Sequence, residues 1–326
     1  MTQNAIFTPS RGPLTIAFLV LPQASILAVA SALDPLRNAN RQLGHEAFRW
    51  RVVSPDGAPV ALTCGLSLPS SGPLNSAEGA DMLIVVAGFQ LNEVATRPLI
   101  RELRCIAPRF SSVGGIDAGP WVMARAGLLD GYRATVHWED LEDMAATHPE
   151  IDVAPDRFVI DRNRVTIGGA APAQDFMLHL IRVRHGAAMA RQVALSFLTL
   201  PRRGAEPQTA PALDPALDPR VARAAARMEA RLDAPESVAV IAAGVGLSAR
   251  RLETLFRLGF GCTPGAHALS LRLQAARRML TETSHPLAEV ALRTGFTSPA
   301  TLSRAFRRAY GLPPGAIRKS ASGNSG

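Results

Sequence analysis

The last third of the chain contains an internal repeat, and this repeat constrains the fold more than any other feature of the sequence. The segments VAVIAAGVGL (238–247) and LAEVALRTGF (287–296) align at an offset of 49 residues, and after one inserted residue the offset becomes 50. The second alignment matches Leu252 with Leu302, Phe256 with Phe306, Arg257 with Arg307, Gly261 with Gly311 and Pro264 with Pro314. So regular a set of matches predicts two copies of one small structural unit.

Each copy has the pattern of a helix, a short turn that contains glycine, and a second helix that begins with serine. Ser248 and Ser298 stand at these starts, and serine hydroxyls are good caps for helix N-termini. Two helix-turn-helix units are therefore predicted. The intervening helix 264–280 would hold the two units at a fixed separation. One side of it carries Leu269, Leu273, Ala276 and Leu280. Two recognition helices that bind one face of DNA lie about 34 Å apart.

The second helix of each copy has an apolar side and a polar side. The side chains predicted to be buried are Leu252, Leu255 and Phe256 in the first copy and Leu302, Phe306 and Ala309 in the second. The opposite sides carry Arg250, Thr254 and Arg257 in the first copy and Thr301, Arg304 and Arg308 in the second. Arginine on an exposed helix can enter the major groove and donate two hydrogen bonds to guanine. For a single helix, a merely solvated face is the alternative.

The positive charge of the chain is confined to the same region. The full sequence has a net charge of +8; residues 1–211 contain 19 basic and 19 acidic residues, whereas residues 212–326 contain 16 basic and 8 acidic. Arginine neutralises phosphates and releases counterions from nucleic acid. Double-stranded DNA is therefore the expected partner. An anionic membrane surface is a weaker alternative, because the arginines fall in a helix-turn-helix repeat and not in an amphipathic surface helix.

The segment 201–219 separates this region from the rest of the chain. It reads PRRGAEPQTAPALDPALDP, with five prolines and no apolar periodicity. Segments of this composition form extended, semi-rigid spacers. We therefore predict a first domain over residues 1–200, a linker over 201–219 and a DNA-binding domain over 220–326.

In the first domain, short apolar runs alternate with helical patterns. Strands are predicted at 15–21, 49–54, 81–87, 109–113 and 133–137, and helices at 25–40, 98–107, 120–126 and 141–148. This alternation is typical of a parallel sheet covered by helices on both faces. A hairpin formed by 158–160 and 165–167, followed by one or two helices within 171–198, is predicted to complete this α/β domain.

The sequence Gly115-Ile-Asp117-Ala-Gly119 stands between a predicted strand and a predicted helix. Small residues two positions before and after a central residue are typical of a nucleophile elbow, which raises the central side chain above the sheet edge. The raised residue here is Asp117. A hydrolase that uses Asp117 as a covalent nucleophile, with His137 as its base, is one hypothesis; a carboxylate that only caps the next helix is another.

The C-terminal region resembles the AraC-type DNA-binding domain over residues 220–326, most clearly in GFTSPATLSRAFRRAYGLPPGAIR (295–318). The resemblance implies two helix-turn-helix units joined by a long helix. It departs at Ile317, where an aromatic residue is common in that family. The resemblance makes Arg250 and Arg304 the first choices for base contacts, with Arg251, Thr254, Thr301 and Ser303 beside them and Arg257, Arg307 and Arg308 as phosphate contacts.

Residues 14–198 resemble the flavodoxin-like, class I glutamine amidotransferase-like domain of GlxA-like transcription regulators. The segments LVLPQASILAVASALDPLRNANR (19–41), RWRVVSPDGAPV (49–60) and ARAGLLDGYRATVHWEDLEDM (124–144) are most similar to regulators of carnitine, glycine betaine or arginine catabolism. Catalytic relatives carry cysteine at the elbow, because a thiolate is their nucleophile. Asp117 stands there in this chain, so a pocket without amidotransferase or protease chemistry is expected.

A carboxylate at the elbow favours a cationic ligand, and aromatic faces can hold a quaternary ammonium group. Trp121, Trp138 and Phe89 fall near predicted strand ends, and Asp34 lies on the helix after the first strand. These four residues and Asp117 are the candidate ligand-binding residues. The alternative places Trp121 and Trp138 in the core.

No metal or cofactor is expected. The three cysteines are far apart and form no C-x-x-C pair, and the pairs His137/His148 and His179/His185 do not have the spacing of a compact metal motif. Residues 14–33 are apolar enough to suggest a signal peptide or membrane span, but Pro22 and Gln23 interrupt the run after seven residues. This favours a buried strand and a helix in a cytoplasmic protein without membrane contact.

Together these features predict a ligand-responsive transcription regulator, an activator of a catabolic operon, with a sensor domain that is not an enzyme. By the resemblance, its partners are promoter DNA, a small cationic effector, RNA polymerase and a second copy bound through the sensor domain. An Asp117 hydrolase fused to a DNA-targeting module is the alternative.

Overall fold

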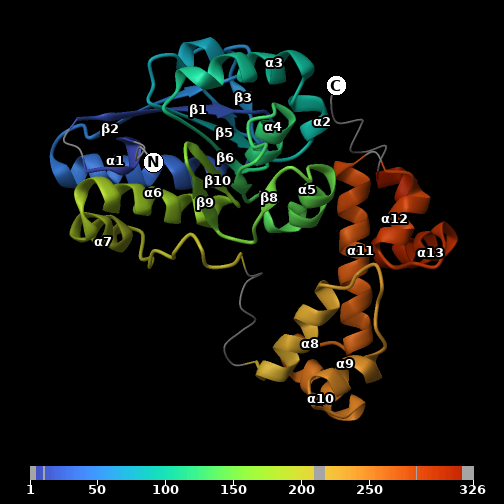
Figure 1. The fold of residues 1–326 in the computed structure, drawn as a ribbon. Coiled ribbons are helices and arrows are strands. Elements are labelled where there is room, and N and C mark those ends of the chain that lie inside the picture. Colours follow the sequence, from blue (N-terminus) through green and yellow to red (C-terminus); the bar gives the residue numbers. More distant parts are fainter. Residues whose placement is uncertain (1–4, 10–11, 209–216, 284, 318–326) are drawn as a thin grey trace. The chain divides into compact units, whose positions relative to one another are not determined.

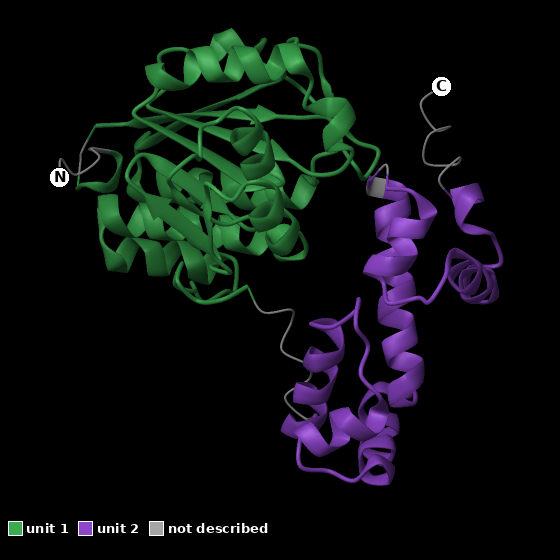
Figure 2. Cartoon of the chain, turned by 45° about the vertical axis from the view of Figure 1, so that its right-hand side comes forward, with its two compact units in different colours: residues 1–210 green, residues 211–326 purple. Residues whose placement is uncertain are grey.

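A computed structural model describes residues 5–9, 12–208, 217–283 and 285–317. The chain forms two compact units, residues 1–210, called here the α/β unit, and residues 211–326, called the helical unit (Figure 2). The predicted fold class is confirmed: a mainly parallel sheet with helices on both faces, followed by an all-helical unit.

The sheet of the α/β unit has the strand order β2-β1-β5-β6-β10-β9. All neighbouring pairs are parallel except β10 and β9, which form the predicted hairpin. The strands are β1 (Leu14–Val20), β2 (Phe48–Val53), β5 (Met82–Ala87), β6 (Ser112–Asp117), β9 (Phe158–Asp161) and β10 (Arg164–Ile167). Two small pairs lie outside this sheet: β3 (Val60–Ala61) with β4 (Ser67–Leu68), and β7 (Arg133–Ala134) with β8 (Asp152–Val153).

Helices cover both faces of the sheet (Figure 1). In β1, Ile16 and Phe18 face the core shared with α1, α6 and α7, whereas Ala17 and Leu19 face the core shared with α3 and α4. Burial on both faces explains why the strands are continuously apolar and do not alternate. The helices are α1 (Ile26–Leu43), α2 (Leu91–Val94), α3 (Arg97–Ile106), α4 (Gly119–Arg125), α5 (Leu141–Thr147), α6 (Ala170–His185) and α7 (Ala187–Ser196).

Two predicted strands differ from the structure. The strand predicted at 109–113 begins only at Ser112, because residues 107–109 form a 3₁₀ turn that contains Pro108, and it continues through Gly114 and Gly115, whose low β-propensity hides it. The strand predicted at 133–137 is reduced to β7, which pairs with β8 outside the main sheet. The apolar segment 14–33 forms β1 and the first part of α1, and no helix in the described ranges is long and apolar enough to cross a bilayer.

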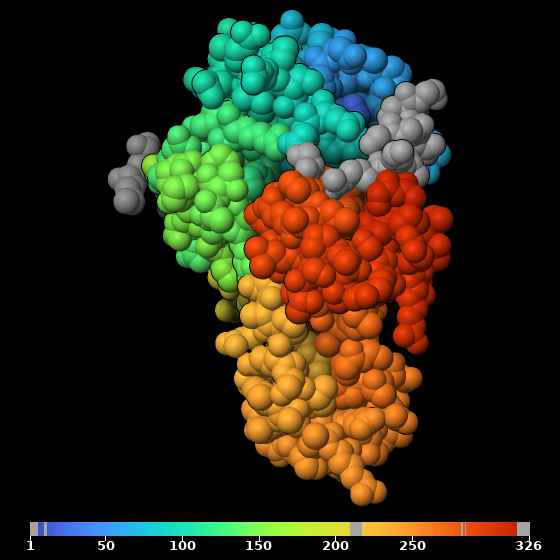
Figure 3. Space-filling view, turned by 90° about the vertical axis from the view of Figure 1, so that its right-hand side faces the viewer, coloured from blue at the N-terminus to red at the C-terminus, as the bar shows by residue number. Residues whose placement is uncertain are grey.

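The helical unit contains α8 (Pro219–Glu229), α9 (Val238–Gly244), α10 (Ala249–Phe260), α11 (Pro264–Glu282), α12 (Leu287–Arg293) and α13 (Pro299–Tyr310). It has two small cores, one among α8, α9 and α10 and one among α12 and α13, and α11 contributes to both (Figure 1). Figure 3 shows one face of this unit in orange and red. Leu273, Ala276 and Leu280 are buried as predicted, but Leu269 is 40% exposed and Ala309 is exposed. Periodicity misplaces these two residues because each core covers only part of its helices.

Residues 201–208, which the proline content places in the linker, pack against the α/β unit; we call them the strap. The Nε2 atom of Gln208 donates hydrogen bonds to Thr135 Oγ1 (2.8 Å) and to the carbonyls of Val136 (2.9 Å) and Asp156 (2.8 Å). The amide of Arg157 donates to the carbonyl of Gly204 at 2.9 Å. Residues 209–216 of the predicted linker lie outside the described residues.

Candidate nucleic-acid interface and elbow site

The first helix-turn-helix unit consists of α9, a turn and α10. Gly246 in the turn has a φ of +72°, a left-handed conformation that costs glycine little. Ser248 caps α10, since its Oγ accepts a hydrogen bond from the amide of Arg251 at 3.3 Å. Leu252 and Phe256 on the inner side of α10 are fully buried, and Leu255 packs beside them. The predicted cap and apolar side are therefore confirmed.

The second unit consists of α12, a turn and α13, with the same local geometry. Ser298 Oγ accepts from the amide of Thr301 at 3.2 Å, and Leu302 and Phe306 are buried. Gly295 in the turn has a φ of +69°, and a Cβ atom there would collide with the carbonyl oxygen of Leu232 in the loop between α8 and α9. The turn of the second unit thus lies directly against the lobe that contains the first.

Arg272 on α11 anchors that turn, and the sequence gives no signal for this role. Its guanidinium donates to the carbonyls of Thr294 (2.7 Å) and Gly295 (2.5 Å) and lies 4.1 Å from the ring centre of Phe296. A charged donor that satisfies carbonyls at a helix end stabilises that end. Arg272 therefore holds α12 to the helix that both cores share.

The predicted DNA-contacting residues lie on the outer sides of α10 and α13. Arg250, Arg251, Thr254 and Arg257 are exposed on α10, and Arg304, Arg307 and Arg308 are exposed on α13. Arg257 pairs with Glu253 at 3.0 Å, whereas within the described part of the chain no carboxylate lies within 4 Å of Arg250 or Arg304. Those two guanidinium groups therefore keep their charge and donors for an outside partner.

The hydroxyl residues of the predicted DNA-contacting set are partly buried or already hydrogen-bonded within the protein. Thr254 Oγ1 donates to the carbonyl of Arg250 at 3.0 Å, so its hydroxyl proton is used inside the helix. Thr301 is half-buried, and its Oγ1 lies 2.9 Å from Ser298 Oγ. Ser303 is half-buried. These side chains support apolar or acceptor contacts better than donor contacts.

The elbow predicted at residues 115–119 is present in the α/β unit. Asp117 ends β6 with a φ of +63°, and α4 begins two residues later at Gly119. A Cβ atom on Gly119 would collide with the carbonyl oxygen of Val85 in β5, which explains the small residue at this position. A non-glycine residue in this strained conformation is characteristic of functional elbows.

Three carboxyl groups meet at the elbow. Burial, followed by the charges of Asp140 and Glu139, raises the pKa of Asp117 from 3.8 to about 7. Asp140 and Glu139 belong to a 3₁₀ turn at residues 138–140, and the amide of His137 before it donates to the carbonyl of Asp117 at 3.4 Å. Nothing in the local sequence around Asp117 signals these neighbours, which are more than twenty residues away.

Two of the predicted aromatic residues lie at the same sheet edge as Asp117. Ala87, the last residue of β5, pairs in register with Asp117, and Phe89 follows two residues later with 48% of its surface exposed. Trp138 begins the turn next to Asp117 and is 42% exposed. Both rings are therefore available to a ligand at this edge.

The other candidate ligand residues have structural surroundings. Trp121, on α4, packs against the core and contacts His148 edge-on, with 5.8 Å between ring centres. Asp34 is half-buried on α1 and pairs with Arg37 at 2.8 Å. Asp34 is about 12 Å along the helix axis from the first residue of α1, and it is that first residue that follows the sheet edge. His137 Nδ1 lies 3.8 Å from Glu139 Oε2.

The cysteine thiols do not lie at the elbow. Cys64 and Cys105 are exposed and Cys262 is half-buried, and none stands at the elbow. Among the residues that the structure describes, no three His, Cys, Asp or Glu side chains are placed to hold a metal ion. The side chain at the elbow is therefore a carboxyl group and not a thiol.

Comparison with known families assigns a family to each of the two units. Residues 15–183 match the DJ-1/PfpI family, and residues 241–320 match the helix-turn-helix domain. The chain belongs to the DJ-1/PfpI family and, within it, to the transcriptional regulators that carry an AraC-type helix-turn-helix domain.

Two relatives are similar over nearly the whole chain. The HTH-type transcriptional regulator CdhR of Pseudomonas aeruginosa is 36% identical over 91% of this chain and 89% of its own. The HTH-type transcriptional regulator GlxA of Rhizobium meliloti is 31% identical over 97% of this chain and 98% of its own. A solved AraC family transcriptional regulator from Pseudomonas putida covers 57% of this chain and 100% of its own, with 28% identity and a TM-score of 0.52. The resemblance to GlxA-like regulators is confirmed.

Proposed function

We propose that this transcription regulator activates a catabolic operon in response to a small cationic metabolite that binds at the elbow. The family establishes regulation through a helix-turn-helix domain. The proposal adds the effector, the activating role and the residues that contact DNA. One observation supports the effector most strongly: a carboxyl group of raised pKa and two exposed aromatic rings share one edge of the sheet.

For DNA, the proposal assigns base contacts to Arg250 on α10 and Arg304 on α13. Both are exposed, and neither is neutralised by a carboxylate of the described residues. By the repeat offset of 50, Arg250 matches Ala300 and Arg304 matches Thr254, so the two helices carry their free arginines at different positions. We therefore expect the two DNA half-sites to differ in sequence. Arg251, Thr254, Thr301 and Ser303 would contribute beside them, and Arg257, Arg307 and Arg308 would contact phosphates.

For the effector, the proposal assigns the charge contact to Asp117 and the aromatic contacts to Trp138 and Phe89. A quaternary or methylated ammonium group, or a guanidinium, can lie against an aromatic face while its charge compensates a desolvated carboxylate. A bound cation would also favour the ionised form of Asp117, so binding is expected to strengthen as the pH rises through about 7.

We also propose that the α/β unit is not an enzyme. A carboxyl group whose pKa is about 7 is only partly ionised at neutral pH, which weakens Asp117 as a nucleophile. Binding of the effector would then act by favouring one arrangement of domains over another. The resemblance supports cytoplasmic assembly as a homodimer through the α/β unit and contact with RNA polymerase.

The test compares choline with its uncharged carbon isostere 3,3-dimethyl-1-butanol, alongside glycine betaine, carnitine and arginine, by thermal unfolding of the purified protein. A ligand of the folded state at 100 times its Kd adds about 2.7 kcal/mol of stability. We expect one cation to raise the Tm and the isostere not to. Asp117→Asn should abolish this rise, whereas Asp152→Asn, an exposed carboxylate on β8, should retain it. A rise that survives Asp117→Asn would refute the elbow site.

A further inference from the structure

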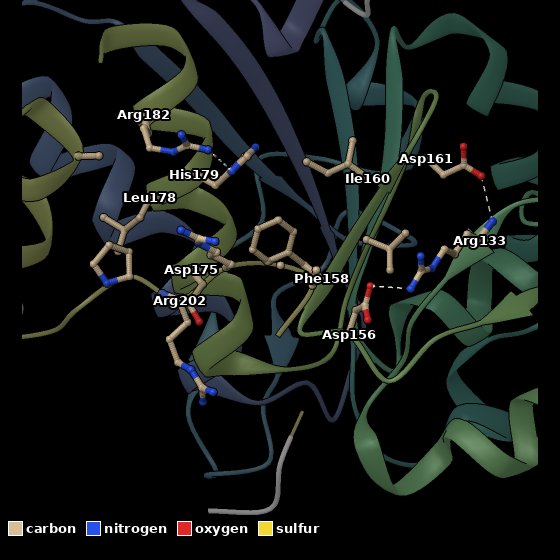
Figure 4. A pocket seen from close by; sticks show the side chains of 16 residues that line it. Arg133, Asp156, Phe158, Ile160, Asp161, Asp175, Leu178, His179, Arg182 and Arg202 are labelled. Carbon is tan, nitrogen blue, oxygen red and sulfur yellow. Dashed lines mark hydrogen bonds and ion pairs between the residues drawn. The ribbon is translucent and has the colours of Figure 1, made fainter. Parts of the chain in front are cut away.

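A separate cleft of about 900 Å³ opens on the α/β unit (Figure 4). Its walls are the edge strand β9, helix α6 and residues 201–205 of the strap. Its volume is in the range of pockets that hold small organic molecules. None of the five candidate ligand residues at or near the elbow lines it.

Part of the cleft surface is apolar. Phe158 and Ile160 come from β9, Leu178 from α6 and Ala190 from α7. The ring of Phe158 is supported edge-on by Phe176, with 5.6 Å between ring centres, so it has a fixed orientation. An aliphatic or aromatic body of a ligand would therefore find an apolar contact surface already in place.

The carboxylates that line the cleft are already satisfied. Asp175 accepts from Arg157 Nη2 at 2.6 Å and from the amide of Arg202 at 2.9 Å, and it is buried. Asp156 pairs with Arg133 at 3.0 Å, and Asp161 accepts from the amide of Arg133 at 2.9 Å. These groups have little capacity left for a cation from outside.

Two arginines at the cleft lack such compensation. Arg182 on α6 and Arg203 on the strap line the cleft and are exposed, and no carboxylate of the described residues lies within 4 Å of either guanidinium. Arg202 differs, because it pairs with Glu206 at 2.8 Å. The cleft thus offers positive charge from α6 and from the strap that no carboxylate of the described residues neutralises.

His179 adds a neutral donor between the apolar surface and Arg182. Its Nδ1 accepts from Arg182 Nη2 at 3.1 Å, which leaves the proton of the neutral ring on Nε2. Burial, followed by the charge of Arg182, lowers the pKa of His179 and keeps the ring neutral. Its ring centre lies 5.5 Å from that of Phe158, so this donor stands directly beside the apolar surface.

We infer that this cleft binds a small carboxylate with an apolar body, whose carboxyl group meets Arg182 and Arg203 while its body lies on Phe158 and Ile160. Because the strap forms one wall, such a ligand would join the strap to the body of the unit. The strap leads directly into the segment that connects to the helical unit. The cleft is therefore a second regulatory site, independent of the elbow, for a ligand of opposite charge.

The first experiment measures binding of three eight-carbon probes to the full-length protein by calorimetry: octanoate, octanol and octylammonium. Octanoate is expected to bind at least tenfold more tightly than the other two. Arg182→Gln and Arg203→Gln should each weaken octanoate binding at least fivefold. Arg191→Gln, an exposed arginine on α7 outside the cleft, and Asp117→Asn should leave it unchanged. Equal affinity for all three probes, no binding of octanoate, or full binding by the Arg182 variant would overturn the inference.

A second experiment reads the strap of the wild-type protein directly. Arg202 and Arg203 are the only Lys or Arg residues between 201 and 219, so trypsin cleavage there reports how firmly the strap is held. Saturating octanoate should slow this cleavage at least fivefold and leave cleavage after Arg191 unchanged. Octanoate that binds without slowing cleavage at 202–203 would show that the ligand occupies another site. Because Asp117→Asn removes only the elbow site, loss of the cation response alone would leave this inference intact.

Discussion

At the scale of single residues, backbone strain and electrostatics coincide at Asp117. The left-handed backbone raises this carboxyl group at the sheet edge, and burial with Asp140 and Glu139 raises its pKa to about 7. Local sequence predicts the elbow because small residues must stand on both sides of it. It cannot predict the acidic neighbours, because tertiary folding alone brings them to Asp117.

The raised pKa has a consequence for stability. A carboxyl group with a higher pKa in the folded chain contributes stability that is complete below its unfolded value near 3.8 and is lost as the pH rises to about 7. Relative to Asp117→Asn, the wild type should therefore lose about 1–3 kcal/mol of unfolding free energy between pH 4.5 and pH 8. Urea unfolding of both proteins at the two pH values measures this difference, with Asp152→Asn as the control. If the difference in unfolding free energy between the wild type and Asp117→Asn did not depend on pH, the raised pKa of Asp117 would be contradicted.

The glycines of the two helix-turn-helix turns are expected to differ in importance. Both have a positive φ, but a Cβ atom at Gly246 meets no atom within 4 Å, whereas one at Gly295 collides with the carbonyl of Leu232. Gly246→Ala should cost about 1 kcal/mol from backbone strain alone. Gly295→Ala should cost at least about 2 kcal/mol, because the loop must move as well. Urea unfolding, followed by the circular dichroism of the helices, measures the loss of unfolding free energy in each variant. Equal losses would contradict the close approach of Gly295 to the carbonyl of Leu232.

At the scale of elements, the helix-turn-helix units could be predicted because their signals are local. Ser248, Ser298 and the buried side chains at helical spacing all fall within short windows of sequence. The predicted burial of Ala309 is wrong, and Leu269 is 40% exposed although it lies on the apolar side of its helix. Periodicity shows which side of a helix is apolar but not how far the neighbouring helices extend. The packing of the strap was missed for a related reason, since it depends on Gln208 contacting residues more than fifty positions earlier.

The two kinds of arginine on α13 should respond differently to mutation. Arg304→Ala is expected to cost about 1–3 kcal/mol of specific binding and to relax the preference at one base position. Arg307→Ala should weaken binding to all sequences alike and reduce the slope of log affinity against log salt by about one. Fluorescence anisotropy on DNA selected from a random pool, across a salt series, separates the two effects. A lower salt slope without a change in preference for Arg304→Ala would assign that residue to phosphate.

At the scale of the whole molecule, charge and chemistry divide between two units with separate cores. The α/β unit is close to neutral and carries the elbow and the cleft, whereas the helical unit carries the positive charge and the two helix-turn-helix units. The sequence predicts this division because composition changes sharply between the units. It cannot predict the cleft, whose walls come from three segments that only the fold brings together.

We propose that both helix-turn-helix units bind DNA at once, each through its own arginine. The most direct measurement is a hydroxyl-radical footprint of the full-length protein on selected DNA. We predict two protected sites on one face, about 10.5 base pairs apart. Arg250→Ala should remove the preference in one site and Arg304→Ala that in the other. A single protected site, or loss of both preferences on either substitution, would contradict the account.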